Sequence, residues 1–187
     1  MGSAIRPRCS SETRPRKRFR HALVAILFFT GALATQAEST SAKAKAEIVD
    51  LLDLQSAAWT RGDVETFVSV YAEDAKFLSS TGLTTGRAEV LARYKRRYPD
   101  AAAMGRLRLE IEDFVAFTDD DGRVTGASVV ARWFLSYPAD AERQDIDGLT
   151  LLTFAPNGSR SRKDGSRKDG SREDGEPRWL IVHDASM

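Results

Sequence analysis

One run in the first half of the chain specifies the order of three structural elements. It reads Ala58-Trp59-Thr60-Arg61-Gly62-Asp63 and continues as Phe67-x-x-x-Tyr71-Ala72-Glu73-Asp74-Ala75-x-Phe77. Gly62 suits the left-handed backbone position that follows a helix end, and Asp63 suits an N-cap because its carboxylate can accept a hydrogen bond from a backbone N–H of the next helix. The run therefore predicts a helix that stops at Gly62, a short second helix that begins at Asp63, and a strand over 76–79.

The residues on either side of this run have helical spacing. Upstream, one face repeats at i, i+3, i+4 and i+7 from residue 47 on, with Ile48, Leu51, Leu52, Gln55, Ala58 and Trp59. Downstream, a third helix is expected from Arg87 to Tyr98, ended by Pro99, with Val90, Leu91, Tyr94 and Tyr98 on one stripe. The small polar residues of 38–46 predict a flexible lead-in to the first helix.

After Pro99 the pattern changes to the period of two that is typical of strands. Leu107, Leu109 and Ile111 alternate with charged residues, and Asp113, Val115 and Phe117 continue the same parity. Asp119-Asp120-Asp121-Gly122 is a hairpin turn signal. Further strands are expected over 123–137, 148–155 and 178–184. Three helices followed by long strands predict an α+β fold, in which a curved antiparallel sheet wraps around the helices.

The amino-terminal part of the chain has the features of an export signal. A basic segment over 1–21 precedes an uncharged run from Ala22 to Ala34. Small residues of the kind found before a signal-peptide cleavage site end at Ala34 and at Ala37. This order is typical of a secretory signal peptide, here 1–37, and the run is shorter than the roughly 20 residues that span a bilayer. We therefore expect an exported protein, periplasmic or secreted, without a stable membrane span after cleavage; an uncleaved anchor is the alternative.

The remaining composition excludes several kinds of site from the expected mature domain, 47–187. The single cysteine, Cys9, lies in the signal region, so disulfides, thiol catalysis and zinc–thiolate sites are excluded. A net charge of +1 does not favour a nucleic-acid partner. A five-residue repeat, Ser-Arg-(Lys/Glu)-Asp-Gly, occurs in three copies over 161–175 without an apolar residue. It predicts a disordered insertion over 157–177; a polyanion-binding arm is disfavoured because the repeat is nearly neutral.

Two titratable residues are candidates for acid–base catalysis, His183 and Asp113. His183 is the only histidine outside the signal region, and its ordinary pKa suits proton transfer near neutrality. Asp113 falls on the apolar parity of its strand, where burial would raise its pKa and suit it to abstract a proton beside a carbonyl. The alternatives are a hydrogen-bonded rim position for His183, and for Asp113 a bulge that turns it outward or a partner such as Arg132. One histidine without cysteine predicts no metal site.

These motifs, together with Thr85-Gly86-Arg87, resemble the NTF2-like superfamily in its SnoaL-like or DUF4440 branch. The ending Trp179-Leu180-Ile181-Val182-His183-Asp184-Ala185 is similar to the Trp-x-Ile-x-x-Asp-His of that branch, although Ala185 stands where many relatives have a second histidine. The resemblance implies a cone of three helices inside a curved sheet, an apolar pocket for a small hydrophobic molecule, and a homodimer. The missing histidine weakens an enzymatic interpretation.

For function, the resemblance leaves two classes open. The first is a ligand-binding protein or a cofactor-independent enzyme of the ketosteroid-isomerase or polyketide-cyclase type, with pocket aromatics Trp59, Tyr71, Tyr94, Trp133 and Trp179. The second is a non-catalytic domain that binds a partner or itself, in which these aromatics are plain core. The two classes differ in whether His183 and Asp113 point into one open cavity.

Overall fold

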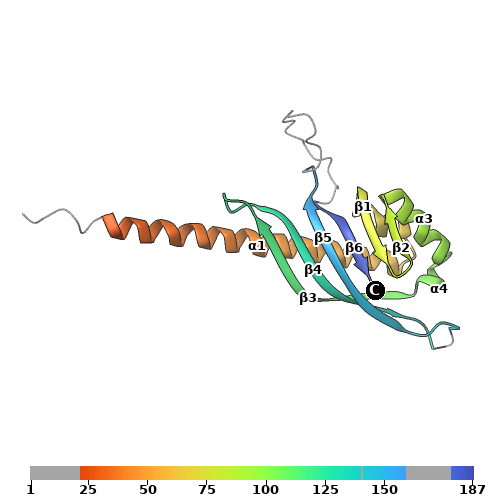
Figure 1. Cartoon of the computed structure of the whole chain (residues 1–187). Helices are drawn as coiled ribbons and strands as arrows, with labels where there is room; N and C mark the ends of the chain where they lie inside the picture. The colour runs from red at the N-terminus through yellow and green to blue at the C-terminus, as the bar shows by residue number, and fades with distance from the viewer. Residues whose placement is uncertain (1–21, 140, 159–177) are drawn as a thin grey trace, which may run out of the picture. The chain divides into compact units, whose positions relative to one another are not determined.

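The computed structural model describes residues 22–139, 141–158 and 178–187 (Figure 1). The chain divides into two compact units between Thr35 and Gln36. In the first unit the described residues, 22–35, are helical and belong to α1 (Ala22–Thr60). Residues 1–21 of the expected signal peptide and the repeat over 161–175 lie outside the described residues. Within the described part of the chain, no helix is both long and apolar enough for a membrane span.

The second unit is a curved six-stranded sheet with helices on one face (Figure 1). After α1 the elements are α2 (Val64–Ser69), β1 (Tyr71–Ser79), β2 (Gly82–Thr85), α3 (Arg87–Arg97), α4 (Ala101–Met104), β3 (Arg106–Thr118), β4 (Val124–Ser136), β5 (Ile146–Pro156) and β6 (Trp179–Ser186). The strand order is β2-β1-β6-β5-β4-β3. The expected α+β cone is confirmed. It differs from the expectation in the extra short elements β2 and α4 and in the parallel pairing of β1 with β6, which makes the sheet mixed.

The junction between α1 and α2 has the predicted geometry. Gly62 has φ +77°, and the side chain of Asp63 accepts a hydrogen bond from the Thr66 backbone N–H at 3.0 Å. A Cβ atom on Gly62 would lie 2.6 Å from the Cβ atom of Ala101. The position therefore has no space for a side chain, and its positive φ also favours glycine. This turn returns α2 against the end of α1 and places Phe67 in the core.

The predicted flexible lead-in over 38–46 is instead part of α1. Ala44 is buried, the Thr40 hydroxyl donates to the Gly122 carbonyl at 3.2 Å, and the Lys45 ammonium lies 5.8 Å from the Phe114 ring centroid. These contacts reach the β3–β4 hairpin, which is distant in sequence. Tertiary packing therefore adds to the helix propensity of the alanine and lysine residues in stabilising this part of the helix.

A one-residue register shift in β3 reverses the parity that the sequence predicts. Ile111 pairs with Ala131 and Asp113 pairs with Val130, so Glu112 is an extra residue, as in a β-bulge. After it, Phe114 takes the inner face, while Asp113, Val115 and Phe117 are exposed. The predicted inward parity of Val115 and Phe117 was wrong, because the inserted residue reverses the alternation beyond it. For Asp113 the structure has the alternative named above, a bulge that turns it outward.

A second register shift occurs in β6. Phe154 of β5 pairs with Ile181 and Thr153 pairs with His183, which makes Val182 the extra residue. Ile181 and Val182 are both buried, His183 is exposed, and Asp184 is only 4% exposed. The shift therefore exchanges the positions of His183 and Asp184 relative to a regular strand.

Replacing Gly62 by alanine is expected to lower the free energy of unfolding by about 2–4 kcal/mol, because backbone strain adds to the overlap with Ala101. Urea denaturation of the variant measures this loss. Gly82→Ala is the matched control, since Gly82 also has a positive φ (+118°) but nothing within 4 Å of its Cβ position. The control should lose only about 1–2 kcal/mol. Equal losses would contradict the steric part of this account.

Candidate functional site

A cavity of about 310 Å³ lies between the helices and the inner face of the sheet. Its walls come from α1, α2, α3 and the strands β1, β3, β4, β5 and β6. Four of the five aromatic residues expected to line a pocket do so: Trp59, Tyr71, Tyr94 and Trp133. Trp179 does not; it is buried and its Nε1 donates to the Glu47 carboxylate of α1 at 3.0 Å.

The helical wall of the cavity is a cluster of aromatic rings around Trp59. The ring centroids of Phe67 and Tyr98 each lie 4.8 Å from that of Trp59, and the centroid of Tyr94 lies 5.5 Å away, all in edge-to-face arrangements. The Trp59 Nε1 donates to the Met104 carbonyl at 2.8 Å. One tryptophan thus connects α1, α2, α3 and α4, and the hydrogen bond holds its indole in place.

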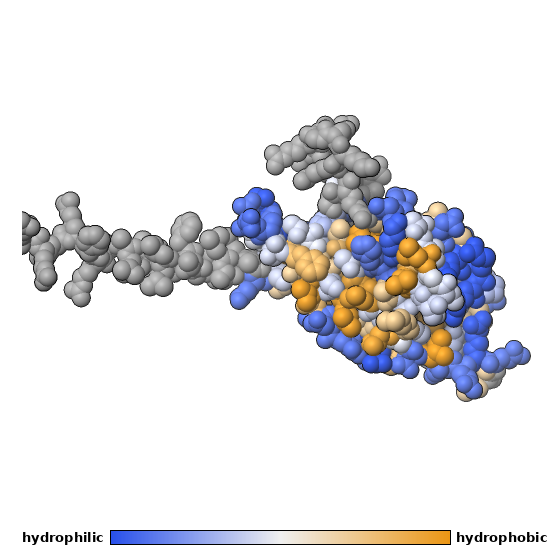
Figure 2. Space-filling model, viewed as in Figure 1, coloured by the Kyte–Doolittle hydropathy of each residue, from blue (hydrophilic) through white to orange (hydrophobic). Residues whose placement is uncertain are grey.

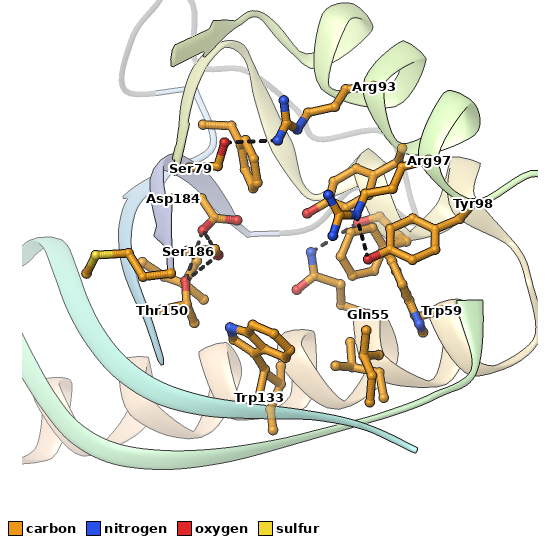
Figure 3. Close-up of a pocket in the computed structure, with 18 of the residues that line it drawn as sticks. Gln55, Trp59, Ser79, Arg93, Arg97, Tyr98, Trp133, Thr150, Asp184 and Ser186 are labelled. Carbon is orange, nitrogen blue, oxygen red and sulfur yellow. Dashed lines mark hydrogen bonds between the residues drawn. The ribbon is translucent and has the colours of Figure 1, made fainter. Parts of the chain in front are cut away.

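The sheet wall carries one buried carboxyl group, Asp184 (Figure 3). The Tyr71 hydroxyl donates to Asp184 Oδ2 at 2.6 Å. The hydroxyls of Thr150 and Ser186 donate to Oδ1 at 2.9 and 2.6 Å. Among the described residues, no cation forms an ion pair with Asp184. The group is therefore held by three neutral donors at the edge of an apolar space.

This environment changes the acidity of the groups involved. Burial raises the pKa of Asp184 above its ordinary value, while the hydrogen bonds from Ser186, Tyr71 and Thr150 lower it in part. The pKa of Tyr71 is raised well above its usual range, first by burial and then by the negative charge of Asp184. Burial, followed by the same charge, also raises the pKa of Tyr94. Both phenols therefore remain protonated near neutral pH, and the Tyr71 hydroxyl donates to Asp184.

Trp133 contributes a second polar group to the sheet wall. Its Nε1 is buried and has no hydrogen-bond partner among the described residues. Figure 3 shows the indole nitrogen turned toward the side of the cavity where Thr150 lies. Gly148 makes room for this ring, because a Cβ atom there would lie 2.4 Å from Trp133 Cζ2. A buried N–H without a partner is unfavourable, so this position suits a ligand that offers an acceptor.

The two sequence candidates for acid–base chemistry lie elsewhere. His183 and Asp113 are exposed and neither lines the cavity. Both positions result from the register shifts at Val182 and Glu112, and Arg132 pairs with Glu112 and Asp147 rather than with Asp113. The structure does not bring His183 and Asp113 into one open cavity.

Sequence reasoning missed the group that does face the cavity, Asp184. The run Trp179-Leu180-Ile181-Val182 contains only apolar residues, so it carries no alternation from which the parity of Asp184 could be read. The only available signal was the spacing within the family-like ending, in which two residues separate Ile181 from Asp184. Positions 181 and 184 lie on opposite faces of a regular strand, because they are three residues apart. Both side chains can face the core only if the strand contains one inserted residue between them.

Comparison with known families decides the classification. A model of the SnoaL-like domain family matches residues 54–160. The chain belongs to the SnoaL-like domain family. A search of curated proteins returned no match.

Solved structures similar to this SnoaL-like domain share its fold. An NTF2-like protein of unknown function from Shewanella oneidensis MR-1 is 28% identical, with 76% of this chain and 97% of that chain covered and a TM-score of 0.56. A domain of unknown function with a cystatin-like fold from Nostoc punctiforme PCC 73102 is 18% identical, with 76% and 75% covered and a TM-score of 0.55. An NTF2-like protein of unknown function from Pseudomonas putida KT2440 is 15% identical, with 79% and 87% covered and a TM-score of 0.53. The last two likenesses concern the fold alone.

The SnoaL-like domain has no group of three or more metal-ligating side chains among its described residues. The polar groups on the cavity wall include the Asp184 carboxyl, its three hydroxyl donors, the Trp133 N–H and the guanidinium groups of Arg93 and Arg97. These are proton donors and acceptors, and they suit binding of a polar ligand group or transfer of a proton.

The raised pKa of Asp184 predicts a specific pH dependence of stability. A carboxyl group whose folded-state pKa lies above its unfolded value contributes stability at low pH, and this contribution is lost as pH rises through the folded pKa. Relative to Asp184→Asn, the wild type should therefore lose free energy of unfolding as pH rises above the ordinary range of an aspartate, about pH 4, and through the raised pKa of the folded state. Urea denaturation of both proteins at several pH values measures the difference.

Asp63→Asn is the control with the opposite sign. The hydrogen bonds from Thr66 lower the pKa of Asp63, so its contribution is present at neutral pH and is lost as pH falls. If the wild type instead gained free energy of unfolding relative to Asp184→Asn as pH rose, burial would not be the main influence on the pKa of Asp184.

Proposed function

We propose that this protein binds a small organic molecule in the cavity and exchanges a proton with it through Asp184. The observation that carries the proposal is a buried carboxyl group that faces an aromatic cavity and has hydroxyl donors in place of a cation. A carboxylate in such a site is a stronger base than one in water, and the hydrogen bonds still allow it to ionise.

The hydrogen bonds of Asp184 leave a defined position for a proton. Each carboxylate oxygen has two lone pairs, and Oδ1 already accepts from Thr150 and Ser186. Among the described residues, Oδ2 accepts from Tyr71 alone, so one of its lone pairs is available to a ligand. Asp184 Oδ2 is therefore the atom that we assign as the proton acceptor.

The chemistry that fits these groups is the shift of a proton beside a carbonyl. Asp184 removes a proton from the carbon next to the carbonyl, and the electron pair of that C–H bond moves into the substrate to give an enolate. The Trp133 N–H donates a hydrogen bond to the enolate oxygen. Return of the same proton to another carbon gives the isomer and regenerates Asp184. The sequence of steps conserves atoms and electrons and consumes no oxidant or reductant.

The basic segment over 1–21 and the apolar run after it support a location outside the cytoplasm. We propose that the ligand is encountered there, in the periplasm or the extracellular space.

The function is tested first by identifying the bound molecule. Native mass spectrometry of the protein purified without added ligand should reveal a mass excess of a few hundred daltons. That molecule is then incubated in D₂O with each variant, and deuterium incorporation at carbon is followed by NMR. Asp184→Asn should slow incorporation by about 100-fold or more, because it removes the base.

Asp113→Asn is the matched control, since it neutralises a carboxylate that is exposed and remote from the cavity. It should retain the wild-type rate of incorporation. An unchanged rate in Asp184→Asn would overturn the assigned role of Asp184. A protein that copurifies with no molecule would favour a cavity filled by its own side chains.

A second candidate function is self-association through the outer face of the sheet. Exposed apolar side chains gather there, as Figure 2 shows over the strands, and they include Leu78, Val115, Phe117, Leu149 and Leu151. The strand register aligns Val130, Leu151, Ala185 and Leu78 in one row across four strands. A patch of this kind supports a homodimer formed by two such faces.

Leu151→Lys should convert this homodimer to a monomer, because it places a charge in the middle of the row. Light scattering coupled to size-exclusion chromatography measures the mass directly. Leu54→Lys is the control, since Leu54 is equally exposed but lies on α1. A wild type that is monomeric at all concentrations would remove this candidate.

A further inference from the structure

The mouth of the cavity carries two positive charges from one helix. Arg93 and Arg97 both line the cavity, and their spacing of four residues places them on the same face of α3 (Figure 3). Arg96, on the same helix, is exposed and does not line the cavity. The positive charge is therefore directed to the cavity by helical geometry.

Both guanidinium groups contact neutral partners. Arg93 Nη2 donates to Ser79 Oγ at 2.9 Å and to Thr81 Oγ1 at 3.0 Å. Arg97 Nε donates to the Tyr98 hydroxyl at 3.2 Å. Within the described ranges neither arginine forms an ion pair, whereas Arg87 on the same helix pairs with Glu73. A guanidinium has five N–H donors, so most of those on Arg93 and Arg97 are available to a ligand.

The orientation of Arg93 is set before any ligand arrives. The Ser79 and Thr81 hydroxyls hold one edge of its guanidinium, and the Phe77 ring packs against it with the centroid 5.2 Å away. A side chain held in this way loses less conformational freedom when it binds an anion. Arg93 is thus a prepared donor at the cavity rather than a freely moving surface cation.

The charges of the cavity are also separated in space. Among the described residues that line the cavity, Asp184 is the single acidic side chain, and it lies on β6, whereas both arginines lie on α3 (Figure 3). A ligand with an anionic group at the arginines keeps that group away from Asp184. Its apolar body then lies against the aromatic wall formed by Trp59, Phe67 and Tyr94.

We propose that the ligand is an organic acid, with its anionic group bound by Arg93 and Arg97 and its apolar body in the cavity. This inference rests on the proposed function, because it names the class of molecule that occupies the same cavity. It adds a requirement for specificity: a neutral molecule of the same shape binds much more weakly.

A pair of probes of nearly the same shape tests the requirement. Binding of 2-naphthylacetate and of 2-naphthylacetamide to the full chain is measured by isothermal titration calorimetry at pH 7. The wild type should bind the acid about 10- to 100-fold more tightly than the amide, as hydrogen bonds to a charged group predict. Arg93→Gln should remove most of this preference, and Arg96→Gln, which removes the same charge from an exposed site, should retain it.

The affinity for the amide serves as the control for folding. The amide carries no charge, so its binding depends on the apolar cavity and not on the charge of the arginines. Arg93→Gln should keep the wild-type affinity for 2-naphthylacetamide. Equal affinities of the wild type for both probes would overturn the organic-acid inference and leave the proposed function in place. Equal losses in Arg93→Gln and Arg96→Gln would also overturn it, since the effect would come from net charge. If neither probe bound the wild type, the proposed function would fail together with this inference.

Discussion

The site depends on one inserted residue in the last strand. Because Val182 is extra relative to β5, Ile181, Val182 and Asp184 are buried while His183 is exposed. A regular strand would expose Asp184 and bury the imidazole instead. The inserted residue therefore determines that the titratable side chain facing the cavity is the Asp184 carboxyl and not the His183 imidazole. It thereby determines which proton-transfer chemistry the cavity supports.

Burial of Asp184 is unfavourable by itself, and the surrounding residues offset the loss of hydration. Three hydroxyls, from β1, β5 and β6, converge on its two oxygens. These strands are neighbours because β6 lies between β1, with which it pairs in parallel, and β5, with which it pairs antiparallel. The mixed sheet order is thus a condition for a stable buried carboxyl, and the aromatic cluster around Trp59 completes the water-poor side of the cavity.

The two faces of the sheet suit different interactions. The inner face combines aromatic rings with the Asp184 carboxyl and the Trp133 N–H, which has no partner in the described part of the chain, and the helix opposite adds Arg93 and Arg97. Such a cavity suits an apolar molecule that carries an anionic group at one end and an acceptor at the other. The outer face presents exposed leucines and valines that suit a second copy of the chain. One SnoaL-like domain can therefore accommodate a ligand in the cavity and a second copy of the chain on the outer face of the sheet.

The sequence by itself determined the central parts of the first three helices, the turn at Gly62–Asp63 and the hairpin at residues 119–122, since helical spacing and turn chemistry are local properties. It named four aromatic residues that line the cavity but left open whether they form a pocket or plain core, and it did not indicate α4. It also indicated the α+β cone. The tertiary structure alone decided the inward or outward direction of residues beyond Glu112 and Val182, the helical state of 38–46 and the parallel pairing of β1 with β6. Each of these depends on contacts between segments distant in the chain. In β6 a one-residue bulge leaves no periodic signal because the run before it is apolar, and in β3 the sequence offered a bulge only as one alternative for Asp113. For that reason His183 and Asp113 were predicted at the site, and Asp184 was found there.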